Sequence, residues 1–141
     1  MKTGRYNVGV GLLVMAAFML YGFLLIYLRD FAPDKEAWVA SYSVGRHFEA
    51  RLAHVHGNLF ALLNLALGFV LARLPSAPDR GRALAAWLGL AGLLMPIGIL
   101  GEVYLGLSPV FVLIGALAMT ASVLVSAVLS LRHWSDTKAP A

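Results

Sequence analysis

Residues 8–28 read VGVGLLVMAAFMLYGFLLIYL, a continuous apolar run without a charged side chain. A helix needs about 20 such residues to cross the roughly 30 Å hydrocarbon core of a bilayer. The run is longer than the apolar part of a signal peptide, and the residues that follow it, Arg29-Asp30-Phe31, offer no small-residue cleavage site. We therefore expect residues 8–28 to form a retained transmembrane helix.

Three further apolar runs follow, at residues 52–72, 83–104 and 109–131. Each run is continuously apolar rather than alternating, which favours helices over the strands of a membrane barrel. The composition agrees, because only 13% of the residues are charged, against about 25% in soluble domains. The sequence predicts an all-α, polytopic membrane protein, a single domain built as a four-transmembrane-helix bundle.

The charge distribution predicts the orientation of the bundle. The net charge of +4 does not indicate nucleic-acid binding in so apolar a chain, because basic loops are typical of the cytoplasmic face of a membrane protein. One side carries the basic residues Lys2, Arg5, Arg73, Arg80, Arg82, Arg132 and Lys138, and the other side carries Arg29, Lys35, Arg46 and Arg51. We expect a multi-pass protein of a bacterial-type inner membrane with both termini in the cytoplasm.

The connection at residues 29–51 is the only long one, and we expect it to lie outside. It combines Trp38, Tyr42 and Phe48 with charged residues, which favours a short amphipathic helix at the interface. We expect His47, in this connection, and His133, in the tail, to be solvated. The chain has no cysteine, which excludes disulfides and thiolate metal sites.

The candidate chemistry lies at the start of the second run, in Ala53-His54-Val55-His56-Gly57-Asn58. On a helix, His54 shares one face with Gly57, Asn58, Ala61 and Asn64. An imidazole beside a strip of small and polar residues would let a flat macrocycle approach the backbone, and histidine is a usual ligand of haem iron. His54 is therefore the expected metal ligand, with Gly57 and Ala61 lining the cofactor.

The other histidine of this segment points to the opposite face of the helix. His56 falls among Leu59, Phe60, Leu63, Leu67 and Val70, a bulky face suited to lipid or a neighbouring subunit. It stays the second candidate for cofactor binding. A purely structural interpretation is also open, since histidines near helix ends reach interfacial water and small residues are common in helix packing.

Two further groups of residues complete the candidate site. Glu102 and Tyr104 end the third run on the side where the second run begins, so we expect them to face His54 across the bundle. Pro96 and nearby glycines suggest a kinked wall shaped around a flat ligand. Arg46 and Arg51 precede the second run, where they would pair with haem propionates or, alternatively, with a nearby acid such as Glu49.

These residues resemble the styrene oxide isomerase family, whose members are small, trimeric, four-helix membrane proteins that bind haem b through a histidine at the start of the second helix. The resemblance rests on Ala50-Arg51-Leu52-Ala53-His54, on Gly68-Phe69-Val70-Leu71, and on Tyr104-Leu105 shortly before Ser108-Pro109. It implies that His54 is the axial ligand and that Tyr104 helps to hold an epoxide. The family's catalytic asparagine and aspartate correspond to Phe60 and Pro96 here, so Asn58 or Asn64 and Glu102 would have to replace them.

The resemblance implies a function and partners. The expected activity is the redox-neutral conversion of a small hydrophobic aryl epoxide, such as styrene oxide, to the aldehyde, with ferric haem b as a Lewis acid. The implied assembly is a homotrimer in a lipid bilayer. Two alternatives stay open from the residues: a haem-b electron-transfer or sensing subunit, and a non-enzymatic membrane assembly protein whose polar cluster serves packing.

Overall fold

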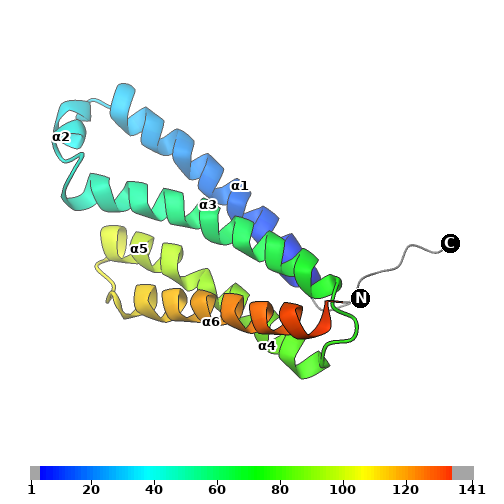
Figure 1. Ribbon diagram of the computed structural model, residues 1–141. Coiled ribbons are helices and arrows are strands. Elements are labelled where there is room, and N and C mark those ends of the chain that lie inside the picture. Colours follow the sequence, from blue (N-terminus) through cyan, green and yellow to red (C-terminus); the bar gives the residue numbers. More distant parts are fainter. Residues whose placement is uncertain (1–3, 135–141) are drawn as a thin grey trace.

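The computed structural model describes residues 4–134, which form six helices and no strand. The helices are α1 (Arg5–Asp30), α2 (Lys35–Ala40), α3 (Gly45–Ala72), α4 (Asp79–Gly92), α5 (Leu94–Leu105) and α6 (Val110–His133). Four segments are long and apolar enough to cross a membrane: α1, α3, α4 together with α5, and α6. The predicted all-α, four-transmembrane-helix bundle is therefore confirmed, and the protein is a multi-pass membrane protein (Figure 1).

Two of the predicted spans differ from the observed helices. The second helix was expected at 52–72 but begins at Gly45, because a helix continues through charged residues once it has left the hydrocarbon. The third, expected over 83–104 with a kink from Pro96, consists of two helices that meet at Leu93, so the expected kink is present. Pro96 causes the break, since it has no N–H to donate to the carbonyl of Gly92.

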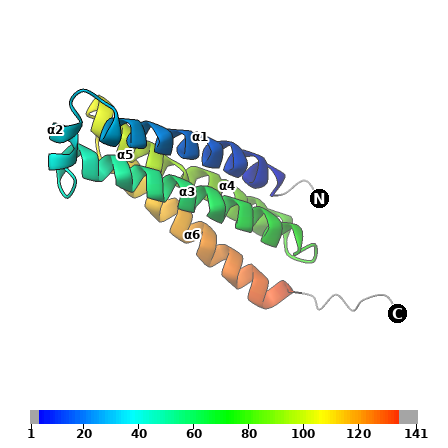
Figure 2. The same cartoon turned by 90° about the horizontal axis from the view of Figure 1, so that it is seen from above.

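The helices pack in two layers, and neighbouring helices within each layer run antiparallel. α1 lies along α3, and α6 lies along α4 and α5, as Figures 1 and 2 show from two directions. The layers meet through apolar clusters such as Phe60, Leu67, Leu93 and Met119. At the helix break, Gly115 of α6 lies directly against the backbone nitrogen of Met95. This crossing leaves no room for a side chain at residue 115.

The start of α1, the 73–78 turn and the end of α6 lie at one end of the bundle (Figure 1). Ser76 Oγ–H donates to the carbonyl of His133 over 3.1 Å, and Gly4 contacts the backbone of Gly68. Lys2 and Lys138, two of the basic residues in the orientation argument, lie outside the described residues. The short helix expected in the 29–51 connection is α2, at the opposite end.

Candidate functional site

The imidazole of His54 is held in one tautomer. Its Nδ1–H donates to the carbonyl of Phe18 in α1 over 2.9 Å, which leaves the lone pair on Nε2; within residues 4–134, Nε2 makes no hydrogen bond. The ring lies against Gly22, where a Cβ would come within 2.7 Å of Cε1 of the imidazole. A glycine at this point lets the ring pack against the α1 backbone. The half-buried His54 therefore joins α1 to α3 while Nε2 stays available.

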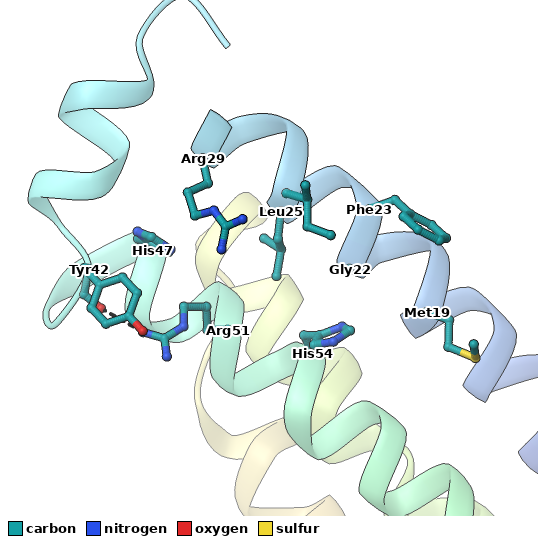
Figure 3. Close-up of a pocket in the computed structure, with 10 residues that line it drawn as sticks. Met19, Gly22, Phe23, Leu25, Arg29, Tyr42, His47, Arg51 and His54 are labelled. Atoms are coloured by element: carbon teal, nitrogen blue, oxygen red, sulfur yellow. Dashed lines mark hydrogen bonds between the residues drawn. The ribbon is translucent and has the colours of Figure 1, made fainter. Parts of the chain in front are cut away.

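His54 lies at the inner end of a cavity of about 520 Å³ between α1 and α3. Cavities of roughly 300–1,000 Å³ are the usual size of small-molecule sites. Apolar side chains of α1 form one wall, and Figure 3 shows the histidine pointing toward them beneath Gly22. The wall residues are Met19, Phe23, Leu25 and Ile26. The cavity thus combines an imidazole nitrogen with an apolar wall.

Two arginines stand at the outer end of this cavity, one on each helix (Figure 3). Arg29 of α1 is already paired with Asp30 through two hydrogen bonds of 2.9 and 2.7 Å. Arg51 of α3 has no acidic partner within residues 4–134. It stacks on the ring of Tyr42 at 3.8 Å and donates to the carbonyl of that residue. Arg51 is therefore the cation available to an acidic group in the cavity.

The other arginine predicted for this role lies elsewhere. Arg46 donates to the carbonyl of Val103 over 3.2 Å and so ties the start of α3 to the end of α5. It does not line the cavity. Arg29, which sequence reasoning did not select, lines it instead, because the antiparallel contact of α1 and α3 brings the end of one helix beside the start of the other.

The expectation that His47 is solvated is wrong. His47 is 3% exposed, its Nδ1–H donates to the carbonyl of Trp38 over 2.8 Å, and its ring stacks on that indole. It also lines the cavity that holds His54. The early start of α3 explains this, since residues 47, 51 and 54 follow helical spacing along one face.

His56 lies outside this cavity. Its Nδ1–H donates to the carbonyl of Leu52 in its own helix over 2.9 Å. Only part of the face around it is open to lipid or a neighbouring subunit, as expected: Leu59 is 46% exposed, but Phe60 and Leu67 are buried against Leu93 and Met119. The second layer of helices covers the part of that side that holds Phe60 and Leu67.

The strip of small residues beside His54 does not form an open surface. Phe18 of α1 lies directly on Gly57, in the space that a Cβ would occupy, and Ala61 is fully buried. The expectation that Gly57 and Ala61 line a flat cofactor is therefore wrong for the single chain. The glycine and the alanine admit a neighbouring helix, the ordinary role of small residues in membrane helices.

Asn64 belongs to a buried hydrogen-bond network rather than to the cavity. It is 0% exposed; it accepts from Nδ2 of Asn7 over 2.9 Å and donates to the carbonyls of Gly89 and Phe60. Asn58 is half-buried and donates only to the carbonyl of His54, in its own helix. Neither side chain lines the cavity.

Tyr104 reaches the surroundings of His54 through a second tyrosine. Its hydroxyl lies 2.9 Å from the hydroxyl of Tyr21, and the ring of Tyr21 is 6.4 Å from that of His54. Since one hydroxyl donates to the other, one O–H of the pair stays free to donate elsewhere. Glu102 is half-buried and, like Tyr104, does not line the cavity.

Tyr21 was not selected from the sequence, because an aromatic residue inside an apolar run carries no distinguishing local signal.

Within residues 4–134, no group of three or more His, Asp or Glu side chains is arranged to hold a bare metal ion. A single imidazole instead suits a metal already held by a macrocycle.

Comparison of the chain with protein-family models, with curated proteins and with solved structures finds no match. The family resemblance therefore rests on the short motifs around His54 and Tyr104.

Proposed function

We propose that this membrane protein binds haem b through Nε2 of His54 and isomerises an apolar aryl epoxide, such as styrene oxide, to the aldehyde. The observation that carries the proposal is the hydrogen bond from Nδ1–H of His54 to the carbonyl of Phe18. Metal-ligating histidines usually donate their other ring N–H to a carboxylate, a backbone carbonyl or water, which fixes the tautomer and orients the ring. His54 is held in this way beside a cavity of suitable size.

The residues around the imidazole fit the rest of the cofactor. Arg51 would pair with a haem carboxylate, because a guanidinium without an acidic partner matches a carboxylate in geometry and charge. Met19, Phe23 and Leu25 would contact the apolar macrocycle. Ferric haem b, when bound, supplies a Lewis acid for the epoxide oxygen.

The proposed reaction is redox-neutral. The benzylic C–O bond breaks, a hydride moves from the neighbouring carbon to the benzylic carbon, and the oxygen becomes the aldehyde carbonyl, so the molecular formula is unchanged. Water would capture the benzylic cation as a diol. The apolar side chains around His54 therefore favour the aldehyde by excluding water.

The tyrosine pair supplies the protein's own hydrogen-bond donor in this proposal. The pair lies beside the imidazole of His54, outside the cavity lining, and its free O–H would donate to the substrate oxygen, on which negative charge develops as the C–O bond breaks. The homotrimer and the cytoplasmic location of both termini belong to the same proposal. A neighbouring protomer would cover the exposed side of the cavity.

The test compares two matched histidines. His54 and His56 both donate Nδ1–H to a backbone carbonyl over 2.9 Å, but only His54 lines the cavity. Protein purified with haem should show a Soret band that His54→Ala loses and that His56→Ala keeps. A Soret band that survives His54→Ala would refute the ligand assignment, and haem-free parent protein after haem supplementation would refute haem binding.

Turnover separates the isomerase from its main alternative. Ferric protein should convert styrene oxide to the aldehyde without a reductant, and dithionite should suppress the reaction because ferrous iron is a weaker Lewis acid. Haem-loaded protein that cycles between ferric and ferrous forms without epoxide turnover would instead indicate electron transfer or sensing.

His47, the second imidazole of the cavity, lies about 10 Å from His54 along the same helix. That spacing disfavours two axial ligands from one chain.

A further inference from the structure

A second cavity, of about 280 Å³, lies between α3 and α6, at the end of the bundle where both helices finish. Its lining is apolar apart from two hydroxyls, those of Ser126 and Ser130. The residues that line this α3–α6 groove are Leu63, Ala66, Leu67, Val70, Val123, Ser126, Ala127 and Ser130. Figure 2 shows α6 crossing α3 at an angle, which separates the two helices on this side. The groove is distinct from the His54 cavity and shares no residue with it.

The hydroxyl of Ser126 has no partner in the described structure. The residue is 5% exposed, and its Oγ is buried without a hydrogen bond to any residue in 4–134. Two other hydroxyls of α6, outside the groove, are satisfied: Ser122 donates to the carbonyl of Ala85 and Thr120 to that of Ala116. A buried hydroxyl without an acceptor is unfavourable, most of all where water is absent. A ligand in the groove that carries a hydrogen-bond acceptor would therefore satisfy the hydroxyl of Ser126.

The position of the two serines along α6 indicates what kind of acceptor fits. At 1.5 Å per residue, α6 is about 36 Å long and exceeds the hydrocarbon core by about 3 Å at each end. Ser130 lies about 4.5 Å from the end of the helix, at the boundary between hydrocarbon and headgroups. Ser126 lies about 6 Å deeper, so only a lipid drawn into the groove by that distance brings an ester carbonyl to it. The ester carbonyls of a phospholipid lie at this boundary, with the acyl chains below them.

Three residues beyond Val70, the last residue that α3 contributes to the groove, the chain carries a cation. Arg73 follows the last turn of α3, is exposed, and makes no ion pair within residues 4–134. The Ser76–His133 hydrogen bond holds this turn against the end of α6. From the membrane interior outward, the groove thus offers apolar side chains, hydroxyl donors and a positive charge. An anionic glycerophospholipid has the complementary groups in the same order. Its acyl chains match the apolar side chains, its ester carbonyls accept from the hydroxyls, and its phosphate carries the charge opposite to that of Arg73.

We propose that the α3–α6 groove binds one anionic glycerophospholipid, with an acyl chain against Leu67 and Val70, an ester carbonyl accepting from Ser126 or Ser130, and the phosphate near Arg73. A helix from a second copy of the chain fits less well. Among the described residues this end of the chain carries Arg5, Arg73, Arg80, Arg82 and Arg132 against Asp79 alone, so a second copy would bring further positive charge to Arg73, whereas an anionic lipid brings the opposite charge.

The test is native mass spectrometry of the full chain in mild detergent, titrated with phosphatidylglycerol and, separately, with phosphatidylcholine. The parent protein should retain one phosphatidylglycerol in preference to phosphatidylcholine. Ser126→Ala should weaken retention about 2- to 12-fold, the effect of one hydrogen bond. Arg73→Gln should remove the preference for the anionic lipid, and Ala66→Phe, at an exposed wall position, should abolish retention by filling the groove.

Matched controls identify non-specific effects. Thr120→Ala removes another hydroxyl of α6, on its exposed side, and Arg80→Gln removes another exposed cation at the same end of the bundle. Both should retain lipid as the parent does. Equal retention by parent, Ser126→Ala and Ala66→Phe would overturn the proposal. So would an oligomer that Ala66→Phe dissociates without change in bound lipid, because the groove would then hold a second copy.

Discussion

Replacing Asn64 by alanine is expected to destabilise the bundle by about 1–3 kcal/mol while leaving haem binding in place. Asn64 makes two hydrogen bonds to other helices, each of 2.9 Å: it accepts from Asn7 and donates to the carbonyl of Gly89. Interhelical hydrogen bonds in membrane proteins average about 0.6 kcal/mol and reach about 1.7 kcal/mol. Two such bonds give the expected range. The Asn7 amide keeps its other acceptor, the carbonyl of Ala86.

The measurement is unfolding by SDS titration in mixed micelles, followed by circular dichroism. Asn58→Ala is the matched control, because Asn58 bonds only within its own helix; it should change stability by less than about 0.5 kcal/mol. In the double variant with Asn7→Ala, the effects should be non-additive, since the two side chains share a bond. An Asn64→Ala protein as stable as its parent would refute the packing role. A stable, haem-loaded variant without epoxide turnover would show that Asn64 is catalytic.

Three further outcomes are expected. Gly115→Ala should prevent stable folding, seen as aggregation on gel filtration, because its Cβ would collide with the backbone nitrogen of Met95; Gly9→Ala, where a Cβ meets nothing within 4 Å, should be neutral or stabilising by up to about 1 kcal/mol. Tyr104→Phe should retain the Soret band but lose about 10²–10³-fold in epoxide turnover, the usual effect of removing one transition-state donor; an unchanged rate would remove Tyr104 from the mechanism. A reporter fused after Lys138 should be active in the cytoplasm, and activity only in the periplasm would reverse the predicted orientation.

The fold class followed from the sequence because membrane insertion depends on a local property. A run such as residues 8–28 has to be helical in hydrocarbon, since every backbone N–H and C=O needs a partner within the segment. Four such runs predict four helices without knowledge of any tertiary contact. The distinction between His54 and His56 was also predictable, because side chains two residues apart point to different faces of a helix.

Which face of each helix meets which neighbour was decided only by the tertiary structure. The strip of Gly57 and Ala61 was correctly placed beside His54, but Phe18 occupies it. A small residue admits either a ligand or another helix, and the sequence does not distinguish them. The same reason explains Asn64, whose acceptors and donors lie on α1 and α4.

The remaining features of the cavity depend on residues far apart in the chain. Arg29 joins Arg51 in the cavity, and Tyr21 meets Tyr104 beside it, because α1 packs along α3 and near α5. His47 is buried because α2 folds back and stacks Trp38 on its ring. The number and approximate position of the helices, and their expected orientation, follow from apolar runs and basic loops. These features depend only on local sequence, because each segment interacts with the bilayer by itself. The hydrogen bond that leaves Nε2 of His54 available depends on a carbonyl thirty-six residues away, and only the packing of two helices brings that carbonyl within reach.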